Sequence, residues 1–170
     1  MDYVIRRANI SDAEVLYSIS LRSHATSYYE NLVSDAQKQN FYDYYKWSAE
    51  RESQFSAVMA RKIVHPAWHV AVAVQGEGII GYVIAHSKIE GKLMIRGLFV
   101  DPSKQSAGVG TALFERSLSW VKSGDSAELT VVEGNVIARS LYEKYRFEVI
   151  GEYEEDFFGA KQVIMQRPAN

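Results

Sequence analysis

The chain has 170 residues, of which 47% are hydrophobic and 24% charged, with a formal net charge of -2 and no cysteine. Its length predicts one domain over residues 1–170, and its hydrophobic content excludes a disordered chain. The lack of cysteine excludes disulfides and cysteine nucleophiles, and the slight acidic excess argues against nucleic acid as the main partner, because phosphate-backbone binding usually shows as a basic excess.

The first elements along the chain are predicted to be a strand, over residues 3–7, and a helix. Ser11 and Glu14 have the spacing of a capping box, in which each side chain bonds the backbone N–H of the other residue. The helix that follows is expected to end near residues 28–29. Three of its apolar residues are expected on the inner face: Val15, Leu16 and Ile19.

A second helical stretch is predicted from Ser34 past Trp47 toward Ile63, and His65-Pro66 ends it. It carries a cluster of aromatic residues between positions 41 and 47. Together with Tyr28 and Tyr29, these aromatics have two interpretations: they line an acceptor pocket, or they pack the N-terminal helices onto a sheet. We favour packing for most of them.

Three strands joined by short turns are predicted next, over residues 68–74, 79–87 and 92–100, and they should form an antiparallel meander. The remaining elements are predicted in the order helix, strand, helix and two strands, over residues 111–121, 128–132, 135–145, 147–151 and 163–166. No apolar run approaches the roughly 18 residues of a membrane span, and the N-terminus lacks the layout of a signal peptide. We therefore expect a cytoplasmic protein with no membrane partner.

The most informative segment is the loop that follows the third strand of the meander. It contains Gln105, Gly108 and Gly110 and leads directly into a helix. Free N–H groups and the helix dipole favour an anion at a helix N-terminus, and glycine lets the backbone approach that anion closely. The segment therefore predicts a phosphate or pyrophosphate site, with a plain helix start as the alternative.

Two common phosphate motifs do not fit this loop. A P-loop needs Gly-Lys-Ser/Thr, whereas Gly110 is followed by Thr111 and Ala112. A dinucleotide fingerprint needs glycine or alanine where Leu113 stands, and its turn is tighter than this loop. A nicotinamide-dinucleotide binder is thus disfavoured.

The spacing Gln105-x-x-Gly108-x-Gly110, after a strand that ends at Val100-Asp101-Pro102, resembles the acetyl-CoA motif of the GCN5-related N-acetyltransferase (GNAT) family. A second match begins at Asn135, in the segment Asn-x-x-Ala-x-x-Leu-Tyr-Glu-Lys-x-x-Phe that ends at Phe147. The resemblance implies the GNAT fold, an α/β (α+β) structure with a splayed mixed sheet, and it covers nearly the whole chain. Arg146 departs from the family pattern, which often has glycine there, and we expect this to change a local turn only.

The resemblance also implies how the chain would bind its co-substrate. The backbone of the strand before the loop would lie against the pantetheine arm, the loop would hold the pyrophosphate, and Asn135 would cap its helix and orient the arm. The residues implied in acetyl-CoA binding are Leu98, Phe99, Val100, Gln105, Ser106, Ala107, Gly108, Val109, Gly110, Thr111, Asn135 and Tyr142.

The implied reaction is direct attack of a neutral amine on the thioester, and no metal is required. Tyr142 matches the family position whose hydroxyl faces the coenzyme sulfur, so it is the expected general acid, and a main-chain N–H near Leu98 or Phe99 would stabilise the oxyanion. Tyr142 as a core aromatic is the alternative. The glutamate that many family members have on the strand before the loop is absent, and the candidate bases are His24, Glu30, His86 and the segment 152–156.

The acceptor is expected to be a primary amine of a small molecule, polyamine or peptide. The acidic residues Glu154, Glu155 and Asp156 would attract a cationic acceptor, or they form a solvated loop. The competing function is a non-catalytic acyl-CoA-binding or sensing module on the same fold. A homodimer through the C-terminal strands is a further expectation.

Overall fold

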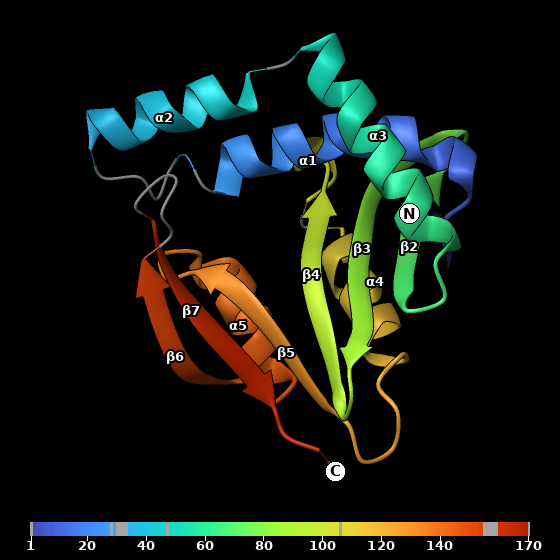
Figure 1. Cartoon of the computed structure of the whole chain (residues 1–170), viewed down its shortest axis with the longest axis vertical. Helices are drawn as coiled ribbons and strands as arrows, with labels where there is room; N and C mark the ends of the chain where they lie inside the picture. The colour runs from blue at the N-terminus through green and yellow to red at the C-terminus, as the bar shows by residue number, and fades with distance from the viewer. Residues whose placement is uncertain are drawn as a thin grey trace.

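Seven strands form one mixed sheet in the order β1-β2-β3-β4-β5-β7-β6, in a computed structural model that describes residues 2–27, 29, 34–46, 48–105, 107–154 and 160–169 (Figure 1). The strands are β1 Val4–Arg7, β2 Trp68–Gln75, β3 Gly78–Ile89, β4 Lys92–Val100, β5 Ser126–Val132, β6 Glu148–Glu154 and β7 Lys161–Arg167. The helices are α1 Ala13–Ser27, α2 Asp35–Tyr45, α3 Ala49–Val64, α4 Val109–Leu118 and α5 Val136–Lys144, with short 3-10 turns at Ile10–Asp12 and Pro102–Lys104. The predicted α/β mixed-sheet architecture and the antiparallel meander β2-β3-β4 are confirmed.

Two apolar cores lie on opposite faces of the sheet, because neighbouring residues of a strand point to opposite sides. In β2, Ala71 and Ala73 belong to the core that contains Leu113 and Phe114 of α4. The alternate residues Val70 and Val72 belong to the core that contains residues of α1 and α3. The sheet is therefore covered by α1 and α3 on one face and by α4 on the other.

The start of the first helical region differs from the predicted capping box. The Asp12 carboxylate accepts the backbone N–H of Asn9 at 2.7 Å and also pairs with the Arg6 guanidinium at 2.7 Å, so the turn begins before Ser11. Leu16 and Ile19 are fully buried as predicted, whereas Val15 is 43% exposed and lies on the outer face. The end of α1 at Ser27 agrees with the sequence.

The predicted second helix is in fact two helices, α2 and α3. Lys46 leaves the helical conformation with ψ 121°, and Ser48 starts α3 by accepting the backbone N–H of Arg51 at 3.1 Å. Ser34 caps α2 in the same way through Gln37. A serine N-cap inside a polar and aromatic stretch therefore redirects the chain where sequence periodicity predicts one continuous element.

Strands β4 and β5 are parallel neighbours that pair over only half of their length. The ladder joins Lys92–Ile95 to Ser126–Leu129 and then stops, although β4 continues to Val100 and β5 to Val132. In Figure 1 the two strands diverge above this point, so the sheet opens into two halves. The expected splay is confirmed, and it leaves one edge of the upper part of β4 without a strand neighbour.

A β-bulge lies where the two strands part. On β3, Ile84 and Ala85 are consecutive, but their partners on β4 are Gly97 and Ile95, so Arg96 is the extra residue. A bulge reverses which face a side chain points to along the rest of the strand. Accordingly, Ile95 before the bulge and Val100 after it both belong to the core beneath α4, and Phe99 packs against the opposite core.

The C-terminus of α5 is closed by a left-handed cap at Arg146, whose φ is +65°. The backbone N–H of Phe147 donates to the carbonyl of Tyr142 at 3.1 Å, and that of Arg146 donates to Glu143 at 2.9 Å. This is the Schellman arrangement, which usually has glycine at the left-handed position. The turn is kept in spite of the arginine, so the change of turn that we expected from the sequence does not occur.

No helix among the described residues combines the length and the apolar character that crossing a bilayer requires.

Candidate functional site

The gap between β4 and β5 holds a cavity of about 150 Å³. Leu98 and Phe99 form its β4 side, and Val131 and Val132 form its β5 side. Asn135 and Tyr142 of the α5 region also line it, and Ser23 and His24 of α1 close one end. A narrow cavity beside an unpaired strand edge suits an extended chain that carries its own hydrogen-bonding groups.

A second cavity, of about 600 Å³, lies between α1, α3 and the sheet. It shares His24, Arg96 and Phe99 with the first cavity, so the two spaces meet at the bulge of β4. Two cavities that meet at shared walls can hold two reactants end to end, with their reacting atoms at the junction.

His24 is a neutral imidazole at this junction. Its Nδ1 lies 2.7 Å from the carbonyl of Ser20, which can only accept, so Nδ1 carries the proton and Nε2 is the acceptor nitrogen. Burial lowers the pKa of His24 to about 4, against the opposing effect of the Ser20 carbonyl. Its ring packs on Phe99 with centroids 4.9 Å apart.

The Phe99 ring is held in place by its neighbours. It lies against Tyr82 at 4.8 Å between centroids, in addition to His24. A Cβ built on Gly97 would overlap the Phe99 ring, so the absence of a side chain at position 97 allows the ring to fold back over the strand. The position of the Phe99 ring, which lines both cavities, therefore depends on this glycine.

Tyr142 lies on α5 and its side chain is 7% exposed. It packs on Phe114 at 4.9 Å between centroids and on Phe147 at 6.3 Å, and the cap at Arg146 fixes the last turn of its helix. Asn135 starts the same helix, because its Oδ1 accepts the backbone N–H of Ala138 at 3.1 Å. Tyr142 thus belongs to the core and also lines the first cavity.

The glycine turn leads into the N-terminus of α4. Gly108 is its N-cap, with φ +78° in the left-handed region that favours glycine, and Gly110 is already inside the helix, which begins two residues earlier than predicted. The first N–H groups of a helix have no partner within it, so they are available to an anion.

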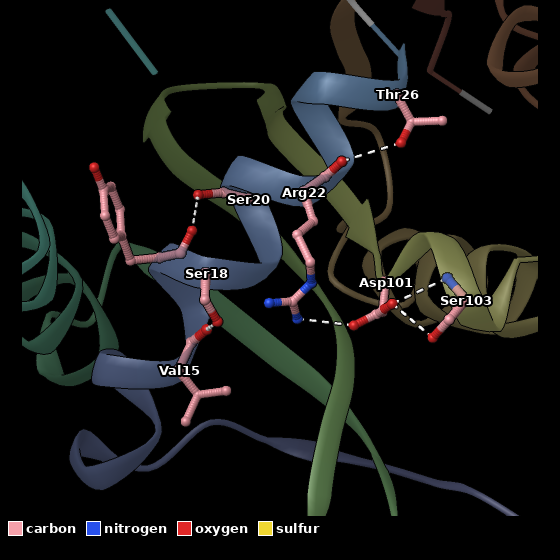
Figure 2. Close-up of polar contacts among 8 residues, drawn as sticks. Val15, Ser18, Ser20, Arg22, Thr26, Asp101 and Ser103 are labelled. Carbon is pink, nitrogen blue, oxygen red and sulfur yellow. Dashed lines mark hydrogen bonds and ion pairs between the residues drawn. The ribbon is translucent and has the colours of Figure 1, made fainter. Parts of the chain in front are cut away.

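An ion pair connects this loop to α1 (Figure 2). Arg22 Nη2 lies 2.8 Å from the carboxylate of Asp101, which also accepts the backbone N–H of Ser103 at 3.0 Å and its hydroxyl at 2.8 Å. Burial raises the pKa of Asp101, but these hydrogen bonds and the Arg22 charge outweigh it, so the pKa is lowered. The carboxylate stays charged and fixes where the loop leaves β4.

Some of the predicted binding residues line the first cavity and others do not. Leu98, Phe99, Asn135 and Tyr142 come together around it, whereas Val100 points into the core beneath α4. Six residues of the turn lie outside the lining of both cavities: Gln105, Ala107, Gly108, Val109, Gly110 and Thr111. Ser106 lies outside the described residues.

The candidate bases are not equally placed. His24 lies at the junction, whereas His86 packs edge-on against Trp68 at 4.8 Å and lines neither cavity. Glu152 pairs with Lys161 at 3.0 Å between β6 and β7. Glu30, Glu155 and Asp156 lie outside the described residues, and of Glu154 only the backbone is described.

The aromatic cluster divides between the two interpretations. Phe41 is buried and its ring lies 6.0 Å from that of Tyr29 between centroids, but neither residue belongs to the two cores on the sheet, so packing of this pair onto the sheet stays a prediction. Tyr44 lines the second cavity. Tyr28 and Trp47 lie outside the described residues. No group of three or more potential metal-ligating side chains occurs in the described part of the chain.

Arg96 is the site residue that the sequence did not identify as functional. It lies on the strand that lacks the glutamate many family members have, and it faces the side of α1 and α3 because it follows Ile95, which belongs to the core beneath α4. The bulge has one local sign in the sequence, Gly97, because a glycine inside a strand often marks an irregularity.

The comparisons with known proteins agree with this geometry. The model of the family described as "Acetyltransferase (GNAT) family" matches residues 20–147. A PaiA N-acetyltransferase from Thermoplasma acidophilum in complex with coenzyme A is similar in structure, with a TM-score of 0.74, 20% identity and 99% of each chain covered. The ribosomal-protein-S18-alanine N-acetyltransferase from Escherichia coli is also similar, with a TM-score of 0.72, 19% identity, and 99% of this chain and 95% of that chain covered.

A third structure, YncA from Salmonella typhimurium with its cofactor acetyl-CoA, gives a TM-score of 0.68 at 16% identity, with 100% of this chain and 95% of that chain covered. At these identities the structures show the fold alone, and no curated protein matches the sequence. The family model, in contrast, covers well over half of the chain. The chain belongs to the GNAT family of acetyltransferases.

Proposed function

We propose that this N-acetyltransferase moves an acetyl group from acetyl-CoA to a primary amine by direct attack in a ternary complex. The observation that carries the proposal is the meeting of two cavities at the bulge of β4, one along the β4–β5 gap and one beneath α1 and α3. The similar structures that contain coenzyme A or acetyl-CoA support the choice of donor.

The residues present fit such a donor. Beyond Ile95, the β4 edge that faces β5 has no ladder partner, so its backbone groups can bond an amide-containing arm. The N-terminus of α4, opened by the left-handed Gly108, suits a pyrophosphate. We assign the arm to Leu98, Phe99 and Val100, with Asn135 beside it. We assign the contacts with the pyrophosphate of the donor to the turn from Gln105 to Thr111.

The reaction forms an N–C bond and breaks the C–S bond of the thioester. The amine loses a proton and the departing thiolate gains one. Tyr142 lines the donor cavity and is the proton donor that we assign to the sulfur. A backbone N–H near Leu98 or Phe99 stabilises the developing oxyanion.

His24 accepts a hydrogen bond from the amine and does not act as the general base that takes its proton. Its pKa of about 4 lies roughly six units below the value of about 10.4 for a lysine-like amine, so complete transfer to the imidazole is unfavourable. Neutral Nε2 can still orient the neutral amine at the junction. The proton leaves through the open cavity to water.

Tyr142→Phe tests the assignment. We expect turnover, measured as thiol release with saturating amine, to fall by about 10²-fold or more, as for loss of a general acid, while acetyl-CoA binding by calorimetry changes little. Tyr145→Phe is the matched control, because that hydroxyl bonds Glu115 at 2.5 Å and lines neither cavity.

Unchanged turnover of Tyr142→Phe would remove this residue from the mechanism. Tight acetyl-CoA binding without turnover on any amine would instead favour the binding or sensing module.

A further inference from the structure

The charges on the wall of the larger cavity are all of one sign among the described residues. Arg51, Lys62 and Arg96 line it, and no described lining residue is an aspartate or a glutamate. Glu52 lies outside the lining, but its charge acts on Tyr17 together with that of Arg51. A cationic acceptor such as a polyamine would bring further positive charge to these three cations, whereas an anion would be attracted.

Two of the three cations already have positions fixed by neighbours. The Lys62 ammonium lies 4.4 Å from the centroid of the Trp68 ring. Arg51 donates to the carbonyl of Asp43 at 3.1 Å and lies over the Tyr44 ring at 5.4 Å. Unlike these two cations, Arg96 takes part in no cation–π contact or ion pair found within the described ranges. Arg96 is therefore the cation best able to bind an incoming anion.

Arg96 lies on the face of the sheet opposite to its neighbour Ile95, which belongs to the core beneath α4. As the extra residue of β4 it faces the side of α1 and α3, and it lines both cavities. An anion held by Arg96 therefore lies close to the junction at which the amine must meet the thioester. An acceptor that uses this contact therefore carries its anionic group and its amine on one small molecule, with only a few bonds between the two groups.

Much of the rest of the wall is apolar or aromatic, with Ser20, His24 and Gln54 as the other polar residues. Phe55, Met59 and Phe99 line the cavity, and the buried Tyr82 completes this side. Apolar and aromatic walls with a few placed polar groups bind a ligand with an apolar body. A highly hydrophilic acceptor would lose hydration here without replacement.

We propose that the second cavity takes a primary amine that also carries a carboxylate on an aromatic or similarly apolar body, and that Arg96 binds the carboxylate. This inference rests on the proposed function, and it narrows the expected acceptors from amines in general to anionic aromatic amines. A guanidinium binds a carboxylate through two parallel N–H donors, which fixes the direction of the ligand as well as its charge.

The test compares 3- and 4-(aminomethyl)benzoate with the corresponding benzamides, which differ in the anion and keep the amine and the ring. We expect kcat/KM for at least one acid to exceed that for its amide by about tenfold or more, the size of a hydrogen bond to a charged group. Arg96→Gln should reduce this acid-to-amide ratio to near one. Arg61→Gln, the same change on an exposed residue of α3 that lines neither cavity, should leave the ratio as in the wild type.

Binding separates this inference from the proposed function. The unreactive probes 4-methylbenzoate and 4-methylbenzamide are titrated by calorimetry into the chain saturated with coenzyme A. Suppose that no amine is acetylated. If the wild type still binds the benzoate more tightly than the benzamide, and Arg96→Gln removes this difference, the result supports the anion contact. A wild type that prefers the amides or spermidine, or an acid-to-amide ratio unchanged in Arg96→Gln, overturns it.

Discussion

Replacing Arg146 with glycine should stabilise the fold. Arg146 is the one non-glycine residue with positive φ in the described part of the chain, and it closes the Schellman cap of α5 at φ +65°. Its side chain is exposed, so the substitution removes little packing. The effect therefore comes from the backbone conformation.

The magnitude follows from two opposing effects. An L-residue with a Cβ costs about 1–2 kcal/mol in the left-handed region, and glycine removes this cost. Glycine also makes the unfolded chain more flexible, which costs about 0.4–1 kcal/mol. The net expectation is a gain of about 0.5–1 kcal/mol in the free energy of unfolding, or a rise in Tm of about 1–4 °C for a chain of this size.

The free energy of unfolding is measured by equilibrium urea unfolding and Tm by thermal unfolding. Two control variants are measured in the same way. Gly91 has φ +70° with nothing within 4 Å of a built Cβ, so Gly91→Ala should destabilise by a similar amount. Arg146→Ala keeps the Cβ and should change stability by less than about 0.5 kcal/mol. A fall in stability for Arg146→Gly, or an equal gain for Arg146→Ala, would refute the account of backbone strain.

Two further predictions concern the junction of the cavities. The folded-state pKa of His24 is about 4 against 6.5 unperturbed, so the unfolded chain binds more protons between these values and stability should rise with pH across this window. The full effect on the free energy of unfolding is up to about 3 kcal/mol. His24→Gln should flatten the plot of stability against pH. The same slope from pH 4 to 6.5 in this variant and in the wild type would contradict the lowered pKa of His24. The added Cβ of Gly97→Ala would overlap the Phe99 ring, so we expect a loss of about 1–2 kcal/mol in stability and a larger rise in KM for the amine than for acetyl-CoA. Equal changes in the two KM values would mean that the ring does not shape the acceptor side.

The elements that the sequence predicts well are those whose information is local. The continuous apolar runs of β2 and β3 and the turn between them define the meander, and the bounds of β4 agree at both ends. The helix after the glycine turn is also correctly predicted, although it begins at Val109 because a left-handed glycine serves as its N-cap.

The misassigned positions are those where competing local signals have similar strength. Asp12 and Ser11 are both acceptable near a helix start, and the ion pair of Asp12 with Arg6 on β1 decides between them. The break between α2 and α3 depends on Ser48 as an N-cap, within a stretch whose periodicity alone predicts a continuous helix.

The junction of the cavities could not be predicted because it is made by residues distant in the sequence. His24 on α1 and Phe99 on β4 are 75 positions apart and their rings are in contact at 4.9 Å between centroids. A lone histidine in a helix gives no sign of this neighbour. The sequence did identify Tyr142 and Asn135, because both belong to a motif within one helix.

The bulge of β4 lies where the proposed donor cavity and the proposed acceptor cavity share lining residues. Pairing with β5 ends at Ile95, and the extra residue that follows puts Arg96 and Phe99 on the same face of the sheet. Without it, alternation would place one of them beneath α4, away from the acceptor cavity.

An arginine at this position does not prevent amine acetylation, because deprotonation of the amine can occur through water and needs no carboxylate on the strand. Its positive charge also lowers the pKa of a nearby amine, which raises the neutral fraction that can attack. If Arg96 binds the carboxylate of the acceptor as we propose, it determines which acceptors bind, and the acid-to-amide ratio measures that selection directly.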